Sequence, residues 1–126
     1  ILMNARRQKS MVLKNTSEAI RREKLGGCGI GGGNTFPVAI PDENGAFIMS
    51  TRLELDPGAS VGYHKHAGTE EVYFIMTGKG LYTEEGEECP AVPGDVFLCR
   101  EGRSHGILNT GEEKLVLGAA ITKSAV

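Results

Sequence analysis

From residue 36 onward the chain is a succession of short apolar or alternating runs, each closed by glycine, proline or aspartate. In the run over residues 46–55, Leu53 and Leu55 fall on one face and Arg52 and Glu54 on the other, which is the period of a half-buried strand. Further strands are expected over residues 60–66, 71–77, 80–83, 88–92, 96–100, 105–109 and 114–121. Such runs, recurring about every 8 to 12 residues with a turn between them, predict an all-β sandwich or barrel that occupies residues 36–126 as one domain.

The composition suits one domain with a core of its own and excludes several classes of protein. Of the 126 residues, 40% are hydrophobic and 24% are charged. No apolar run approaches the roughly 18 residues of a membrane helix, so we expect a soluble protein with no membrane partner. The net charge of -2, without a basic stripe interleaved with aromatics, argues against a nucleic-acid partner. A small molecule is the expected ligand.

The cysteines point to a reducing compartment. Cys28, Cys89 and Cys99 are odd in number, far apart and form no C-x-x-C pair. This spacing argues against both a disulfide framework and a cysteine-ligated zinc site, and it favours a cytoplasmic setting. Cys99 has no evident base beside it in the sequence, so we interpret it as a buried free thiol rather than a nucleophile.

The first 35 residues differ from the rest. Residues 1–10 are basic and begin without methionine, and we interpret them as a leader that is either foreign to the natural protein or disordered. Residues 11–35 are expected to form an N-terminal arm with a glycine-rich connector. Within that arm, residues 15–25 predict a short helix capped by Thr16 or Ser17.

The connector is the glycine-rich stretch "GGCGIGGG" at residues 26–33. A phosphate-binding loop would require G-K-[ST] at the start of a helix, and a dinucleotide loop would require a strand before and a helix after the glycines. Neither context is present. The stretch is therefore interpreted as a flexible or closely packed connector that uses the permissive dihedral angles of glycine.

A candidate metal site lies in the stretch that begins with an H-x-H sequence. His64 and His66 are one strand period apart, so their imidazoles point to the same face and can hold one ion. The third histidine, His105, also lies where a turn meets a strand, and two acids, Glu70 and Glu71, follow the pair. Strand parity does not choose between these acids, because residues of either parity over 71–77 are apolar enough to face a core.

The residues from 58 to 109 resemble the two sequence motifs of the cupin family. The first motif is a glycine, five residues, H-x-H, three or four residues, a glutamate, six residues and a glycine, and it is matched by Gly58, His64, His66, Glu71 and Gly78. The second is a glycine, five residues, P-x-G, two residues, a histidine, three residues and an asparagine, and it is matched by Gly94, Gly102, His105 and Asn109. Arg100 replaces the proline of the second motif. This departure affects the entry to a turn and leaves the ligand positions intact.

The resemblance implies a double-stranded β-helix, or jelly roll, with an ion held inside the barrel by His64, His66, Glu71 and His105. The six residues that the motif places between its glutamate and its last glycine select Glu71, since Glu70 would need seven. Glu70 would then be a carboxylate at the rim, or an acceptor for the second N–H of a ligating imidazole.

Three imidazoles and one carboxylate suit manganese, iron, cobalt, nickel or zinc rather than Cu(I) or an iron–sulfur cluster. Four protein ligands would saturate a tetrahedral zinc. A six-coordinate ion would keep two positions at which a small oxygen-bearing ligand or O2 could bind. We therefore expect one divalent transition metal per chain, in a site capable of chemistry.

Two further residues are candidates for contact with a substrate. Arg52 could pair with a carboxylate at the mouth of the barrel, although it alternates away from the apolar face of its strand, where a solvated or interface role is the alternative. Tyr73 shares the parity of Glu71 and could donate a hydrogen bond in the pocket, or be an ordinary core tyrosine.

Two functions remain open on these grounds. The first is a metal-dependent oxygenase, decarboxylase or isomerase acting on a small anionic or carbonyl-bearing metabolite, as members of the cupin family variously are. The second is a cupin that binds a metal or metabolite without turnover, as a sensor or storage module. A complete ligand set with open positions favours the enzyme.

The resemblance also implies a homodimer, because small single-unit cupins commonly pair through their sheets. Val72, Phe74 and Met76 share one parity and could supply such a face. Burial of these side chains against the chain's own second sheet is the alternative.

Overall fold

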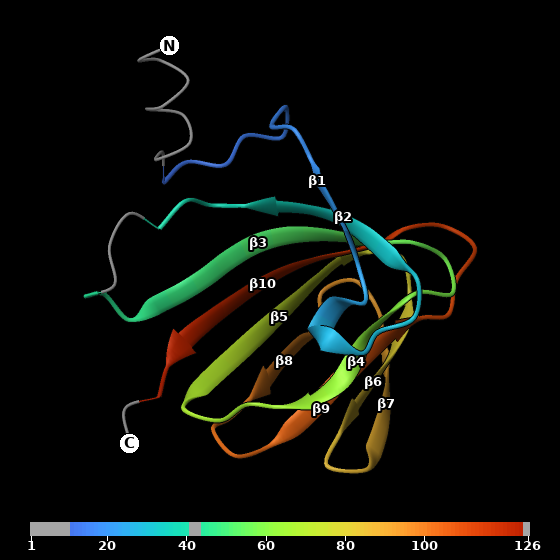
Figure 1. Ribbon diagram of the computed structural model, residues 1–126. Helices are drawn as coiled ribbons and strands as arrows, with labels where there is room; N and C mark the ends of the chain where they lie inside the picture. Colours follow the sequence, from blue (N-terminus) through green and yellow to red (C-terminus); the bar gives the residue numbers. More distant parts are fainter. Residues whose placement is uncertain (1–10, 41–43, 125–126) are drawn as a thin grey trace.

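The computed structural model describes residues 11–40 and 44–124, which form two facing antiparallel sheets (Figure 1). In chain order the strands are β1 (Ile20–Glu23), β2 (Gly32–Pro37), β3 (Phe47–Leu55), β4 (Ser60–Lys65), β5 (Thr69–Thr77), β6 (Gly80–Glu84), β7 (Glu87–Ala91), β8 (Val96–Cys99), β9 (Ser104–Asn109) and β10 (Leu115–Lys123), with one 3-10 turn, η1 (Leu25–Gly27). One sheet has the order β1-β2-β3-β10-β5-β8 and the other β4-β9-β6-β7. The predicted all-β jelly roll is confirmed; the leader expected over residues 1–10 lies outside the described residues.

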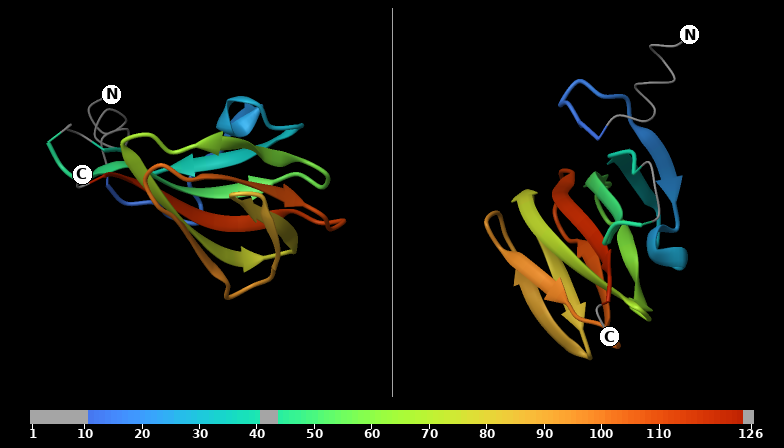
Figure 2. Two further views of the ribbon diagram at one scale, coloured as in Figure 1. Left: turned by 90° about the horizontal axis from the view of Figure 1, so that it is seen from below. Right: turned by 90° about the vertical axis from the view of Figure 1, so that its left-hand side faces the viewer.

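The core lies between the two sheets and follows from the alternation of the central strands. Leu53 of β3, Leu117 of β10 and Ile75 of β5 are neighbours in register, and all three are buried. Ile107 of β9 and Val61 of β4 face them from the smaller sheet. Burying these side chains on the inner faces gives the two-layer arrangement that Figure 2 shows from two further directions.

The helix predicted over residues 15–25 is wrong. The segment instead contributes β1, whose residues from Ile20 to Glu23 pair with β2 from Thr35 to Gly32, followed by the single turn η1. Pairing with the free edge of β2 gives the backbone N–H and C=O groups of β1 hydrogen-bond partners. A short isolated helix would leave the groups at its ends unpaired, and such helices are marginal in water. Gly26, with a φ of 72°, ends any helical continuation.

The glycine-rich connector is closely packed against β4. A Cβ at Gly29 would lie 2.2 Å from the carbonyl oxygen of Ser60, and a Cβ at Gly62 would lie 2.4 Å from Sγ of Cys28. Real side chains cannot approach backbone this closely, so glycine on both sides lets the two segments touch. The connector thereby holds the N-terminal arm onto β4, which carries His64.

The side of the larger sheet that faces away from the core carries a cluster of exposed or partly exposed apolar residues. We call this cluster the outer face and define it by Val72, Phe74, Met76, Val96 and Leu98. Phe74 pairs with Val96 and Val72 with Leu98 in register, and Phe74 and Leu98 are 50% and 54% exposed. The alternative that the chain's own second sheet buries Phe74 and Met76 is therefore wrong.

In the part of the chain that the structure describes, no helix is long and apolar enough to cross a membrane.

Candidate metal centre

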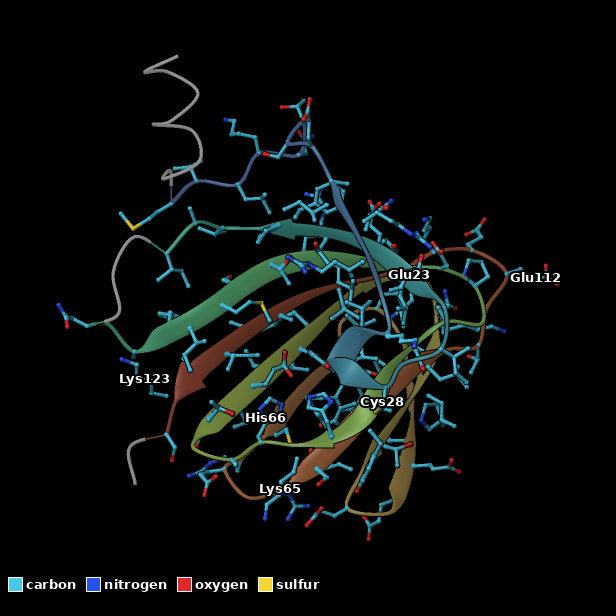
Figure 3. All side chains as sticks on the ribbon, viewed as in Figure 1. Glu23, Cys28, Lys65, His66, Glu112 and Lys123 are labelled. Atoms are coloured by element: carbon cyan, nitrogen blue, oxygen red, sulfur yellow. The ribbon has the colours of Figure 1, made fainter. Side chains whose placement is uncertain are left out.

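Three strands from both sheets bring the candidate ligands together inside the barrel. His64 lies on β4 and His66 directly follows it, while His105 on β9 is the register partner of His64. Glu71 enters from β5 of the opposite sheet. In Figure 3, His66 points between the sheets, whereas the neighbouring Lys65 projects outward from the edge of the molecule. His64 and His66 thus point to the inside of the barrel and Lys65 to the outside (Figure 3), as the H-x-H sequence predicts.

The ligand atoms of these four residues converge on one point. Nε2 of His66 lies 3.2 Å from Nε2 of His64, 3.0 Å from Nε2 of His105 and 3.0 Å from Oε1 of Glu71. Nε2 of His105 lies 2.9 Å from the same carboxylate oxygen. His66, Glu71 and His105 are buried to within 5% of full burial, so water competes little for these atoms.

Hydrogen bonds on the far side of the rings set which nitrogen carries the proton. Nδ1 of His64 lies 2.6 Å from the carbonyl oxygen of Gly62, which can only accept, so the proton is on Nδ1 and the Nε2 lone pair faces inward. Nδ1 of His105 lies 3.0 Å from the hydroxyl of Tyr82, which itself donates to Oε1 of Glu84 at 2.5 Å. His105 therefore donates from Nδ1 as well, and its Nε2 is an acceptor. Nδ1 of His66 is 2.8 Å from Oγ1 of Thr69.

The electrostatic environment favours the ligand form of His64 and of Glu71. Burial lowers the pKa of His64, and the neighbouring imidazoles of His105 and His66 lower it further, against the opposing contact with Gly62. Burial on its own would raise the pKa of Glu71, but hydrogen bonds from His105 and His66, made when an inward nitrogen carries a proton, outweigh it and hold that pKa below its usual value. A bound cation would take the place of that proton. Neutral imidazoles beside a carboxylate are the forms that bind a metal.

The spacing of the donor atoms fits a transition metal. Two atoms each about 2.1 Å from one ion lie about 3.0 Å apart when the bonds meet at right angles, and about 3.4 Å apart at the tetrahedral angle. The four distances given above, from 2.9 to 3.2 Å, match the right angle. Inward lone pairs and a carboxylate without a proton between them would repel one another, so the donor set calls for a cation.

The structure separates the two adjacent acids. Glu71 lies in the cluster, whereas Oε2 of Glu70 lies at the rim, 3.1 Å from Nε of Arg100. Arg100 is the residue that replaces the proline of the second motif. The departure from the motif thus gives Glu70 an ion-pair partner away from the ligands.

Tyr82 and Glu84 support the centre and were not identified from the sequence. Tyr82 links His105 to Glu84, and Glu84 in turn accepts a hydrogen bond from Nε of Arg103. No sequence spacing marks Tyr82, because it meets His105 only through the pairing of β6 with β9. These hydrogen bonds orient the imidazole ring of His105 through its Nδ1 atom.

A cavity of about 320 Å³ opens beside the centre, and His64 and Glu71 form part of its wall. Tyr73 also lines it, with its ring stacked on His105 at a centroid distance of 4.9 Å, and burial raises the pKa of its hydroxyl. Arg52 does not line the cavity: its guanidinium lies 4.0 Å above the ring of Phe36. Arg22 of β1, which was not singled out from the sequence, does line it.

Comparison with known proteins identifies the family. The family model for the cupin domain matches residues 51–121, which is more than half of the chain. The chain belongs to the cupin family. This cupin is 44% identical over 73 residues to an oxalate-binding protein of Thermotoga maritima, an alignment that covers 58% of this chain and 60% of the relative. It is 29% identical over 82 residues to a germin-like protein of Arabidopsis thaliana, covering 61% of this chain and 39% of the relative. The cupin thus spans less than two thirds of the length of these curated relatives.

Among solved structures, a crystal structure of a predicted oxalate decarboxylase from Thermotoga maritima aligns with a TM-score of 0.83. The sequence identity is 32%, and the alignment covers 90% of this cupin and 99% of the other chain. The similarity therefore extends over nearly the whole fold.

Proposed function

We propose that this cupin holds one divalent transition metal through His64, His66, Glu71 and His105 and binds a small carboxylic acid at that metal. The convergence of these donor atoms at right-angle spacing beside a cavity is the observation that carries the proposal. Four protein ligands leave two positions of a six-coordinate ion, which suits the two oxygens of a chelating acid.

The metal, when bound, would polarise the oxygens of the acid and stabilise negative charge on them. The residues of the chain supply the setting. Apolar walls that include Met49, Leu53 and Ile121 keep water away and so strengthen the attraction between cation and anion. Tyr73 lines the same wall, and burial raises the pKa of its hydroxyl, so this group stays protonated and is the proposed hydrogen-bond donor to the acid.

The relatives support a small acid as the ligand. One is named an oxalate-binding protein and the other a predicted oxalate decarboxylase, and the second aligns with this chain over nearly its full length. Oxalate is accordingly the first compound to test.

Binding is the function that the geometry supports best, and turnover is the second candidate. Among the described residues that line the cavity, Glu71 is the only carboxylate, and it is a proposed ligand, so the wall offers no separate carboxylic acid for proton transfer. Four protein ligands would leave two positions on a six-coordinate ion, and this is the argument that favours an enzyme.

Titration of the Mn(II)-loaded protein with oxalate by calorimetry tests the proposal. We expect oxalate to bind the wild type and the Lys65→Ala variant, whose side chain is exposed, but not His66→Ala. Equal binding of oxalate to the metal-free protein would contradict the proposal. Release of formate and CO2 from oxalate above the rate with free Mn(II) would establish turnover.

A further inference from the structure

The cavity is larger and more apolar than a two-carbon acid requires. Its volume of about 320 Å³ falls in the range of about 300–1,000 Å³ typical of small-molecule pockets. Leu25, Met49, Leu53, Val61 and Ile121 form much of its wall. A ligand held only at the metal would leave this wall without contacts.

The polar side chains of the wall are mostly already bonded within the protein. Oγ1 of Thr35 donates to the carbonyl oxygen of Ile20 at 2.9 Å. Oγ1 of Thr51 accepts from the backbone N–H of Phe36 at 3.1 Å. A polar group in the middle of a ligand would therefore lose its water partners with little in return, which disfavours it here.

Arg22 is the exception, because strand register places it on the inner side of the sheet. Ile20 pairs with Thr35, and Thr35 pairs with Leu53, so these three side chains share the inner face. Arg22, two residues from Ile20, points to the same side as Ile20, whereas Arg21 points to the other and bonds Asp56.

Among the described residues that line the cavity, Arg22 is also the only Lys or Arg. Within residues 11–40 and 44–124, no hydrogen bond or ion pair engages its guanidinium. Arg22 is itself exposed, as is the rest of β1, and its guanidinium offers a planar set of donors that matches a carboxylate.

We propose that the natural ligand is a longer acid with two anionic ends: a chelating carboxylate at the metal, an apolar spacer along the cavity wall, and a second carboxylate bound by Arg22. This inference rests on the proposed function and specifies the class of its ligand. It assigns to β1, and hence to the N-terminal arm, a part in choosing the ligand.

Calorimetry with matched pairs of acids tests the inference on Mn(II)-loaded protein. The probes are 2-oxo diacids of five, six and seven carbons, each compared with the 2-oxo monoacid of the same length. Both members of a pair present the same chelating end, so only the distal carboxylate differs. We expect the diacid of at least one length to bind the wild type roughly five- to tenfold more tightly than its monoacid.

Variants test whether Arg22 causes the preference for the diacid over the monoacid. Arg22→Gln should bind both members of the pair equally, and Arg22→Lys should keep part of the preference because it keeps the charge. Arg52→Gln, which removes an arginine away from the cavity, should behave as the wild type. Circular dichroism and manganese analysis of every sample confirm that each variant is folded and loaded.

The outcomes separate the two proposals. If the protein binds manganese and the acids but shows no diacid preference, or keeps it in Arg22→Gln, the role of Arg22 is overturned while the proposed function stands. If the wild type takes up no manganese, the proposed function fails and this inference fails with it.

Discussion

Each of the inward-facing imidazole nitrogens depends on a partner at the opposite nitrogen of its ring. Gly62 supplies a carbonyl to His64, Thr69 a hydroxyl to His66, and Tyr82 a hydroxyl to His105. Such partners orient the ring and raise the basicity of the ligating nitrogen. The ligand residues alone are therefore an incomplete description of the centre.

Replacing Tyr82 with phenylalanine tests this dependence. The change removes the acceptor for Nδ1–H of His105 while keeping the ring that stacks on Phe97. We expect Mn(II) affinity to fall about 10- to 100-fold with little loss of thermal stability. Competition with a metallochromic chelator measures the affinity, and Tyr63→Phe, at a half-exposed position, is the matched control. An unchanged affinity would show that His105 needs no support from Tyr82.

Sequence reasoning identified the four candidate ligands that the structure brings together, but not the residues that hydrogen-bond to them. The H-x-H spacing and strand alternation predict that His64 and His66 share a face, and the family spacing singles out Glu71. Parity failed to separate Glu71 from Glu70 because Val72 and Phe74, on the opposite side of β5, are apolar although they lie on the outer face. Tyr82 was missed because no local sequence pattern indicates that it contacts His105.

The N-terminal arm is an element of the site as well as of the fold. The connector packs on β4 next to His64, and a Cβ at Gly26 would lie 2.9 Å from Nδ1 of that histidine. The arm thus covers the ligand-bearing strand from outside and forms part of the cavity wall through Leu25.

Substituting alanine for Gly62 should disrupt this contact. Its Cβ would lie 2.6 Å from backbone atoms of both Cys28 and Gly29, which cannot move without displacing the arm. We expect a loss of about 1–3 kcal/mol in the free energy of unfolding, measured by urea denaturation. Gly45→Ala, where a Cβ would meet nothing within 4 Å, should change stability much less. Equal effects of the two substitutions would mean that the close approach contributes nothing.

Local sequence patterns predicted the strands from β3 to β10, but they did not predict β1 and β2. The expected strands over 46–55 and 71–77 correspond closely to β3 (Phe47–Leu55) and β5 (Thr69–Thr77). The helix over 15–25 was wrong because pairing of β1 with β2 is a tertiary contact, and it overrides a weak local propensity. Arg22 was overlooked for the same reason, since a helix would have placed it elsewhere.

For the whole molecule, the outer face is the feature with no function assigned inside a single chain. The homodimer expected from the family resemblance stays a prediction, as does the cytoplasmic setting. A symmetric pairing of two outer faces would remove several large apolar side chains from water in each chain.

Replacing Phe74 with glutamate tests the dimer. A buried, unpaired carboxylate at the centre of such an interface is costly, so we expect the variant to be monomeric at micromolar concentration and the wild type dimeric. Sedimentation velocity measures the state, and Ile30→Glu places the same charge at an exposed position on the arm as the control. A monomeric wild type would rule out the predicted pairing.

Elemental analysis tests whether one metal ion is held by His64, His66, Glu71 and His105. Protein purified without chelator, from cells supplied with manganese, iron, cobalt, nickel and zinc, should carry about one divalent ion per chain in the wild type and in Lys65→Ala. His66→Ala should carry far less. A folded wild type without stoichiometric metal, or a His66→Ala variant that retains as much metal as the wild type, would contradict the account.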